Sequence, residues 1–407
     1  MTICRFCGSK IDLTLVDLGE QPPSNSYLSA ADAPEKEFPL HTVVCEDCHL
    51  VQLADEVPPG EIFTADYAYY SSFSASWVAH AKIYAEQMIE RFNLGPDHKV
   101  VEVASNDGYL LQHFVGAGVP VLGVDPVAGC ADAAREKGVE TEVAFFNAET
   151  AERLKAAGHG ADLMTANNVL AHVPDIRGFV EGFAILLNDD GVATFEFPHL
   201  LNLLDQVQFD TIYHEHYSYL SLLAVEGIFT ACGLRVFDVE KLPTHGGSLR
   251  VYACRTKSTR HPDQPALSAM RVAEKAAGLH SRLAYQGFEA KCQTVREGLL
   301  NFLDAARLEG KTVAGYGAAA KGNTLLNYAS VGANDIDFVC DGNPAKQGKF
   351  LPGSRIPVLS PDHIDSAKPD YVLILPWNLK DEISTQLSRI RDWSGQFVVA
   401  IPEIEVW

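Results

Sequence analysis

Residues Val100–Leu110 read VVEVASNDGYL, and this stretch determines how the rest of the chain can be interpreted. Its apolar first half predicts a buried strand, and the polar, glycine-containing second half predicts a tight turn into a helix that begins near Tyr109. The turn from Glu102 to Gly108 brings bare backbone close to a ligand. A strand, turn and helix of this kind typically form the first unit of a doubly wound parallel sheet, whose ligands bind at the carboxyl ends of the strands.

The turn also indicates the class of ligand. The next apolar run ends in Asp125, about 18 residues beyond the turn, where a carboxylate can accept both ribose hydroxyls of an adenosine. The Gly-x-Gly-x-x-Gly pattern that places a pyrophosphate on a helix N-terminus is absent, so S-adenosylmethionine fits better than a nicotinamide dinucleotide. A turn that binds no ligand remains the alternative interpretation. Asn167 and Asn168, at the carboxyl end of the apolar run over 161–167, are also expected to face the ligand, and helix capping is the alternative role for either of them. The expected cofactor residues are Glu102, Ala104, Asn106, Asp107, Gly108, Asp125, Asn167 and Asn168.

Alternation of apolar runs and helical stretches extends outward from this unit. Runs over 99–105, 119–125, 161–167 and 191–197 predict parallel strands, with helices from near Gly129 and Asp175. Runs over 233–242 and 247–255 extend the sheet without a helix of comparable length between them, and a second α/β pattern begins near residue 309. The predicted class is α/β, comprising a zinc-binding module (1–72), a class I, Rossmann-like S-adenosylmethionine methyltransferase domain (73–257), a helical connector (258–308) and a Rossmann-type domain (309–407).

Four of the nine cysteines form two CxxC pairs near the N-terminus. Four thiolates arranged as two such knuckles bind a tetrahedral Zn²⁺, and a closed Cys₄ site leaves no position for a reactive water. The zinc is therefore expected to be structural, and it replaces the core that this short segment lacks. A redox CxxC or two chance pairs are the alternatives. The expected ligands are Cys4, Cys7, Cys45 and Cys48.

Residues 209–221, FDTIYHEHYSYLS, collect aromatic, imidazole and carboxylate side chains in one short stretch. A metal site through His214, Glu215 and His216 is one interpretation, but the HExxH helix of zincins is absent. A structural aromatic cluster is another. We prefer acid–base catalysis, because histidine titrates near neutral pH and tyrosine can stabilise an oxyanion. His172, which follows the strand over 161–167, can reach the same crevice.

The charge of the chain excludes some partners. Its 53 Asp and Glu residues exceed its 32 Lys and Arg residues, which gives a formal charge of -21. This balance argues against affinity for nucleic acid and for an anionic membrane surface. The sequence contains neither a run long enough to span a bilayer nor the apolar stretch of a signal peptide, so we expect a cytoplasmic protein, monomeric or weakly self-associating.

Seven motifs in order along essentially the whole chain resemble the three-domain sugar C-methyltransferases. One departure is visible, because the usual first glycine of the cofactor turn is Ala104, which is still small enough to admit a ligand. The motifs are CxxC…CxxC, DLGEQPPSNSYL, EVASNDGYLL, NNVLAHV, YHEHYSYLS, THGGSLR and YGAAAKGNTLLN.

The resemblance implies that the chain methylates C-3 of a nucleotide-linked 4-keto-deoxysugar through an enolate, and we expect the nucleotide to be dTDP. It also implies a structural zinc in the first domain, S-adenosylmethionine in the second and much of the nucleotide sugar in the third. His216 corresponds to the proposed general base of a Tyr-x-Glu-His motif that Tyr213 and Glu215 complete, and His172 matches a second active-site histidine.

The C-terminal turn Gly315-Tyr-Gly317-Ala-Ala-Ala320 alone would indicate NAD, and an NAD-dependent nucleotide-sugar dehydrogenase or epimerase is the rival enzyme. A non-catalytic scaffold is the third hypothesis. In the context of the family, this helix N-terminus is expected to receive the sugar nucleotide's diphosphate. The plainer alternatives are aromatic packing for Tyr67 and Tyr70, a tight connection for His245 and Gly246, and a solvated surface position for Lys321. The expected substrate residues are Tyr67, Tyr70, Ser72, His245, Gly246, Gly317 and Lys321.

Overall fold

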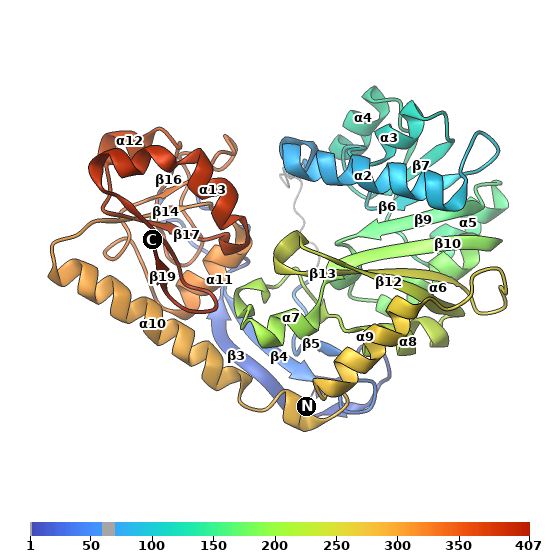
Figure 1. Ribbon diagram of the computed structural model, residues 1–407, viewed down its shortest axis with the longest axis horizontal. Coiled ribbons are helices and arrows are strands. Elements are labelled where there is room, and N and C mark those ends of the chain that lie inside the picture. The colour runs from blue at the N-terminus through green and yellow to red at the C-terminus, as the bar shows by residue number, and fades with distance from the viewer. Residues whose placement is uncertain (1, 59–69) are drawn as a thin grey trace.

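The computed structural model describes residues 2–58 and 70–407. It has a central α/β lobe, on the right in Figure 1, a C-terminal α/β lobe on the left, and N-terminal strands beneath and between them. Tyr67, expected to contact the substrate, lies outside the described residues.

The central sheet has seven strands in the order β12-β13-β10-β9-β6-β7-β8. Strands β6 to β10 are parallel, and β13 runs antiparallel between β10 and β12. The predicted doubly wound sheet and its extension by two late strands are confirmed. The strands are β6 (Val100–Val103), β7 (Val121–Asp125), β8 (Thr141–Val143), β9 (Ala161–Asn167), β10 (Leu187–Pro198), β12 (Leu234–Leu242) and β13 (Ser248–Arg255).

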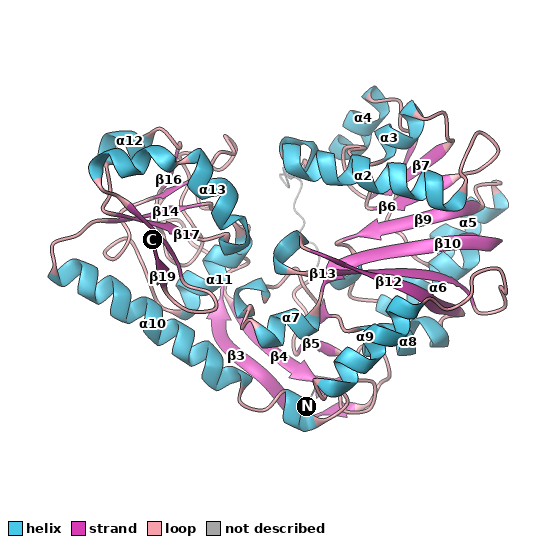
Figure 2. Ribbon diagram, in the orientation of Figure 1, coloured by secondary structure: helices cyan, strands magenta, loops and turns pink. Residues whose placement is uncertain are grey.

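Helices cover both faces of this sheet (Figure 2). The largest, α2, begins where the Ser74 hydroxyl accepts the backbone N–H of Trp77 and ends at Asn93, whose φ of 51° is left-handed. Asp175 caps α6 by accepting the N–H of Gly178 at 2.9 Å. The helices are α2 (Ala75–Phe92), α3 (Leu111–Gly116), α4 (Ala128–Glu136), α5 (Ala148–Ala156), α6 (Ile176–Leu186), α7 (Leu200–Asp205), α8 (Leu222–Ala231) and α9 (Pro265–Ala276).

The N-terminal part contains a four-stranded sheet in the order β11-β5-β4-β3. Its edge strand β11 comes from the His-Glu-His stretch, because Ser218 pairs with Gln52 and Tyr219 with Val51. The N-terminal sheet therefore holds one end of the predicted catalytic stretch. The strands of this sheet are β3 (Leu13–Gln21), β4 (Phe38–Val44), β5 (Val51–Leu53) and β11 (Ser218–Tyr219). The strands β1 (Thr2–Ile3) and β2 (Lys10–Ile11) form a separate two-stranded antiparallel sheet.

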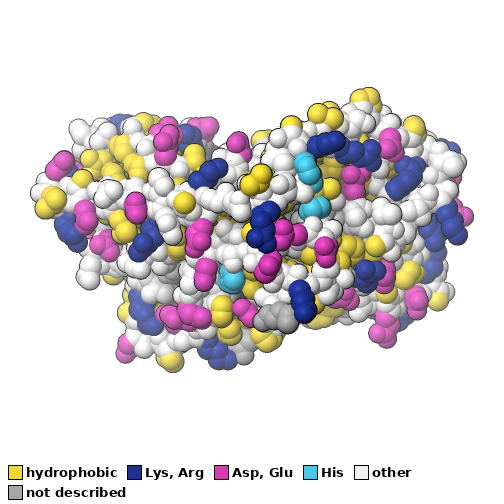
Figure 3. Space-filling view, turned by 90° about the horizontal axis from the view of Figure 1, so that it is seen from below, with side chains coloured by type: hydrophobic (Ala, Val, Ile, Leu, Met, Phe, Trp, Pro, Cys, Tyr) yellow, Lys and Arg dark blue, Asp and Glu magenta, His cyan; other side chains and the backbone are white. Residues whose placement is uncertain are grey.

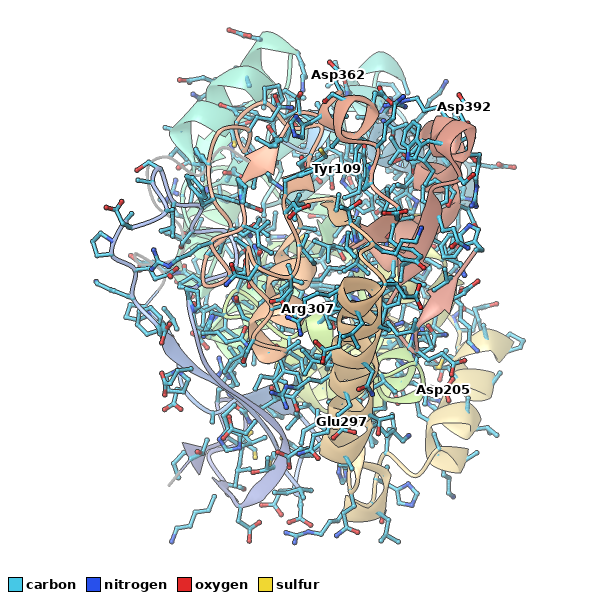
Figure 4. All side chains as sticks on the ribbon, turned by 90° about the vertical axis from the view of Figure 1, so that its left-hand side faces the viewer. Tyr109, Asp205, Glu297, Arg307, Asp362 and Asp392 are labelled. Carbon is cyan, nitrogen blue, oxygen red and sulfur yellow. The ribbon has the colours of Figure 1, made fainter. Side chains whose placement is uncertain are left out.

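The C-terminal lobe is a second Rossmann-type unit, with sheet order β16-β15-β14-β17-β18-β19 and all pairs parallel except β18 with β19. The long helix α10 carries Glu297 and Arg307 on its exposed face (Figure 4). The elements are α10 (Phe288–Leu308), β14 (Val313–Tyr316), α11 (Ala320–Tyr328), β15 (Val339–Cys340), β16 (Val358–Leu359), α12 (His363–Ala367), β17 (Tyr371–Ile374), α13 (Lys380–Gln386), β18 (Gln396–Val399) and β19 (Glu405–Val406).

Short 3₁₀ helices form several connections between these elements. All of them except the fifth contribute residues discussed below. They are η1 (Ser71–Phe73), η2 (Leu170–His172), η3 (Phe209–Thr211), η4 (Thr244–Gly246), η5 (Arg282–Ala284), η6 (Trp377–Leu379) and η7 (Ser388–Trp393).

The N-terminal sheet joins the two lobes through shared apolar packing. Val43 and Leu50 belong to the core of the central lobe, whereas Leu15 and Leu40 belong to a core that includes α7, α10 and the C-terminal lobe. Burial of apolar surface on both sides makes the sheet a structural bridge between the lobes.

The surface carries mixed charge. Acidic and basic side chains are interspersed on the face shown in Figure 3. Among the described residues, no helix combines the length and apolar character needed to cross a membrane.

Candidate active site

The four cysteine thiols of the two CxxC pairs lie within 4.8 Å of one another. Each pair forms the same knuckle, in which the residue after the second cysteine, Gly8 or His49, has a left-handed φ and donates its N–H to the carbonyl of the first. Zn–S bonds of about 2.3 Å in a tetrahedron require sulfur separations of about 3.8 Å. The Cys4–Cys48 and Cys7–Cys45 separations of 3.5 Å fit that requirement.

The turn after β6 is tied to the acidic residue that ends β7. One carboxylate oxygen of Asp125 accepts the N–H of Asn106 at 2.8 Å, and the other accepts the N–H of Val127 at 2.9 Å. Ala104, Asn106 and Gly108 all have left-handed φ angles, so the backbone turns sharply here. The carboxylate is therefore held at the point where the first two strands end.

Carboxyl groups gather around this turn. Glu102 is buried, and this burial together with nearby Asp125 and Asp107 raises the pKa of its carboxyl well above its usual value. Burial also raises the pKa of Asp125. Lys137 pairs with Asp107 at 2.9 Å. An acidic environment suits a ligand that carries a sulfonium and an ammonium group.

The carboxyl ends of β9 and β10 face the loop that contains η4. The Asn168 amide lies 3.2 Å from His245 Nε2, and Asn167 ends β9. The His245 ring packs edge-on against Trp77 at 5.4 Å. Burial, and then nearby Lys321, lower the pKa of His245 to about 4. This imidazole is therefore neutral near pH 7.

Hydrogen bonds determine the tautomer of His216. Its Nδ1 lies 2.9 Å from the carbonyl oxygen of Thr211, which can only accept, so Nδ1 carries the proton. Nε2 therefore has a lone pair, which accepts the Tyr213 hydroxyl at 2.8 Å. Burial, and then nearby His172, lower the pKa of His216 well below its usual value. The side chain is thus a neutral imidazole with a basic Nε2.

His172 and Glu215 lie beside this imidazole. The ring of His172 meets that of His216 edge-on, with centroids 4.6 Å apart, and burial lowers its pKa to about 4. Glu215 is buried and accepts the side-chain amide of Asn25, in the loop between β3 and β4, at 2.5 Å. Burial raises the pKa of Glu215 to about 7, which favours its protonated form at neutral pH far more than for an exposed carboxyl.

His214 faces away from His216. Its Nε2 lies 3.2 Å from the carbonyl oxygen of Phe38, which belongs to the N-terminal sheet. Within residues 2–58 and 70–407, the group found with three or more potential metal ligands is the four-cysteine cluster. A metal site through His214, Glu215 and His216 therefore receives no support.

The C-terminal glycine turn is close-packed. A Cβ on Gly317 would lie 2.4 Å from Pro376 Cδ, so only glycine fits. The neighbouring N–H of Ala318 donates to Asp341 at 2.7 Å, which repeats the arrangement of Asp125 and Asn106 in the central lobe. Lys321 donates to the Asn378 side chain at 2.8 Å and lies 4.9 Å from the Trp377 ring. Burial lowers the pKa of this lysine.

Tyr70 and Ser72 lie next to the cofactor turn. The Ser72 hydroxyl accepts Lys137 at 2.7 Å, and the adjacent N–H of Ser71 donates to the Asn106 side chain at 2.9 Å. A contact between Tyr70 or Ser72 and the sugar stays a prediction.

Sequence reasoning placed Glu196 at the carboxyl end of a strand without giving it a role, and it did not identify the polar partners that complete the site. Glu196, at the end of β10, accepts Thr244 at 2.8 Å, Arg250 at 2.8 Å and His80 at 3.1 Å. Burial opposes its ionisation, but hydrogen bonding and charge from His80 and Arg250 lower its pKa to about 2. Asn25 lies within a family motif and Glu196 at a strand end, but nothing local in the sequence indicates their partners.

A surface cavity of about 760 Å³ lies elsewhere, at the amino ends of β9 and β10, where Asp162 and Gly191 line it. Ligands of open α/β sheets bind at the carboxyl ends, so this cavity is separate from the candidate site. The cavity beside His216, which Thr211 and Tyr219 also line, has room for about one water.

Comparisons with known proteins match all three parts of the chain. Residues 4–63 match a family described as "Putative zinc binding domain", residues 78–239 match "Methyltransferase domain", and residues 243–402 match "C-methyltransferase C-terminal domain". The predicted zinc-binding module and class I methyltransferase domain are thereby confirmed.

The chain is 39% identical over 406 residues to the C-methyltransferase NovU of Streptomyces niveus, and the match covers 99% of this chain and 96% of that relative. It is 30% identical over 95 residues to a ubiquinone biosynthesis O-methyltransferase of Chelativorans sp. (strain BNC1), which covers 23% of this chain and 38% of that one. A magnesium protoporphyrin IX methyltransferase from Synechocystis PCC 6803, solved with bound SAM, gives a TM-score of 0.34 at 15% identity, over 44% of this chain and 79% of that chain. The chain, which matches a zinc-binding domain, a methyltransferase domain and a C-methyltransferase C-terminal domain in that order, therefore belongs to the S-adenosylmethionine-dependent C-methyltransferases.

Proposed function

We propose that this C-methyltransferase adds a methyl group to C-3 of a nucleotide-linked 4-keto-deoxysugar, with dTDP as the nucleotide. The single observation that carries the proposal is the His216 imidazole, whose Nδ1–H bond to Thr211 leaves a basic Nε2. C-methylation requires a carbon nucleophile, and a proton next to a ketone is acidic enough for a neutral imidazole to remove.

His216 takes the C-3 proton on Nε2, and the C–H electron pair becomes part of an enolate whose negative charge rests on the 4-keto oxygen. The protonated fraction of Glu215 and the Tyr213 hydroxyl are donors that can stabilise that oxyanion. Neutral His172 stays beside the base and adds no positive charge to repel the arriving proton.

S-adenosylmethionine supplies an electrophilic methyl group when it is bound. We assign its ribose to Asp125 and its remaining contacts to the turn from Glu102 to Gly108 and to the ends of β6 and β9, at Asn167 and Asn168. With the cofactor bound, its methyl group would form the new C–C bond to C-3, and its sulfur would keep the electron pair of the broken S–C bond.

We assign the nucleotide diphosphate to the C-terminal lobe. The turn at Gly317 opens helix α11, whose first N–H groups and dipole favour phosphate, and Lys321 follows within the first helical turn. His245 and Gly246 then lie between the two proposed ligands, on η4.

The test is methyl transfer to dTDP-, GDP- and CDP-linked 4-keto sugars, with the product examined by NMR. We expect transfer to the dTDP-linked sugar and a new methyl signal at C-3. C-5 is also next to the ketone, so a methyl group there would overturn the C-3 assignment. Tight binding of NADH without binding of S-adenosylhomocysteine would instead favour the dehydrogenase hypothesis.

A further inference from the structure

The orientation of His216 depends on the short turn η3 (Phe209–Thr211). The carbonyl oxygen of Thr211 accepts the Nδ1–H of His216. A shift of this turn would therefore move the imidazole and weaken the hydrogen bond that keeps the proton on Nδ1. The turn also holds itself together, because the Thr211 hydroxyl donates to the carbonyl of Gln208 at 2.7 Å.

The C-terminal lobe contacts this turn and the residue that follows it through two hydrogen bonds. The indole N–H of Trp377, on η6, donates to a carboxylate oxygen of Asp210 at 2.8 Å. The hydroxyl of Thr324, on α11, donates to the carbonyl oxygen of Ile212 at 2.9 Å. Asp210 and Thr324 are both fully buried. Residues on either side of Thr211 are therefore fixed from the lobe that carries the proposed diphosphate site.

Trp377 has little freedom to move. A Cβ on Gly246 would lie 2.3 Å from Cη2 of the indole, so η4 touches one edge of the ring. The Lys321 ammonium group lies 4.9 Å from the ring centroid, a distance at which cation–π attraction is effective. The indole is thus confined by two segments while its N–H points to Asp210.

We propose that Trp377 and Asp210 form a positioning pair through which the C-terminal lobe fixes the η3 turn and so orients the His216 imidazole. This inference rests on the proposed role of His216 as the base. It gives the C-terminal lobe a part in the chemical step in addition to holding the nucleotide.

The test compares Trp377→Phe with a matched control, Trp393→Phe. Phenylalanine keeps an aromatic ring but lacks the N–H, which leaves the buried Asp210 carboxylate without this donor. Trp393 lies in the same lobe and donates its indole N–H to the Pro369 carbonyl at 3.0 Å, away from η3. We expect Trp377→Phe to lower kcat about tenfold to a hundredfold and to change KM less than about threefold, because a small misplacement of the base strongly lowers the rate of proton removal.

The control variant should keep kcat within about twofold of wild type. A Trp377→Phe variant with unchanged kcat, or with a change in KM alone, would overturn the proposal. The pairing is tested by adding Asp210→Ala. If the two residues act through their contact, the double variant should be no slower than the slower single variant, whereas additive losses would contradict the pairing.

Thr324→Val keeps the proposal testable if Trp377→Phe does not fold, and the ring ¹⁵N resonances of His216 keep it testable if no sugar is turned over. Thr324→Val removes the bond to Ile212, the residue directly after η3, with little change in shape, and it should also lower kcat more than KM. The ¹⁵N resonances of the His216 ring report its tautomer directly and should shift in Trp377→Phe but not in Trp393→Phe. Shifted resonances in an enzyme without sugar methylation would reject the proposed substrate alone, whereas unshifted resonances would reject the positioning pair.

Discussion

Replacement of His216 by asparagine is the sharpest test of the proposed base. Asparagine can keep a hydrogen bond but cannot accept a proton, so the C-3 proton should no longer leave. Loss of a general base lowers a rate by about 10²- to 10⁴-fold, or about 2.7 to 5.5 kcal/mol of barrier. Loss of the single neutral hydrogen bond to Tyr213, which spans 2.8 Å, would account for only about 1 kcal/mol, roughly fivefold.

The assay is exchange of the substrate's C-3 proton with deuterium from the solvent, with S-adenosylhomocysteine bound. His216→Asn should abolish exchange and methylation together while both ligands still bind. His214→Asn is the matched control, because His214 is two residues away and is also buried but bonds to Phe38 in the N-terminal sheet. Exchange within tenfold of wild type in folded His216→Asn, or an equal loss in His214→Asn, would refute the assignment.

The pH dependence of the same reaction gives a second check on His216. Only the neutral imidazole accepts a proton, and burial holds its pKa well below the usual value, so exchange should persist below pH 6.5. At pH 5.5 an ordinary imidazole would already be about 90% protonated. A rate that halves at pH 6.5, as for an exposed histidine, would contradict the geometry.

Three further predictions concern other parts of the site. Elemental analysis should give about one zinc per chain, and Cys45→Ser should lower both metal content and Tm; unchanged zinc would remove Cys45 from the site. Asp125→Ala should weaken S-adenosylmethionine binding at least about tenfold and leave nucleotide-sugar binding nearly intact, whereas equal loss of both would count against the ribose contact. Because the pKa of Glu215 is about 7, its proton is lost above that pH and wild-type activity should fall there; Glu215→Gln, which keeps a donor, should lack that decline in a pH–rate profile.

The sequence predicted the elements whose signal is local. Apolar runs located β6, β7, β9 and β10, and Asp175 marked the start of α6. It missed β8 and α12, because three and five residues are too short to show periodicity. The pairing of β11 with β5 also had no local signal, since the two strands are far apart in the chain.

The same division holds for the site. Turn chemistry and strand ends are local signals, and they are enough to single out Asp125 and Asn168, whereas His216 was singled out by the resemblance to the family. The contact between Asn25 and Glu215 joins residues 190 positions apart, and it depends on how three parts of the chain pack. No pattern of spacing encodes such a contact, so the electrostatic state of Glu215 follows only from the three-dimensional arrangement.

The strand β11 has a consequence for how the protein is made. Synthesis proceeds from the N-terminus, so β3, β4 and β5 leave the ribosome long before Ser218 and Tyr219 exist to pair with β5. Until then the outer side of β5 is an open edge, a template on which another nascent chain can pair. Early zinc binding would hold the young module in shape during this interval, and the His-Glu-His stretch would close the edge only once most of the central lobe has been translated.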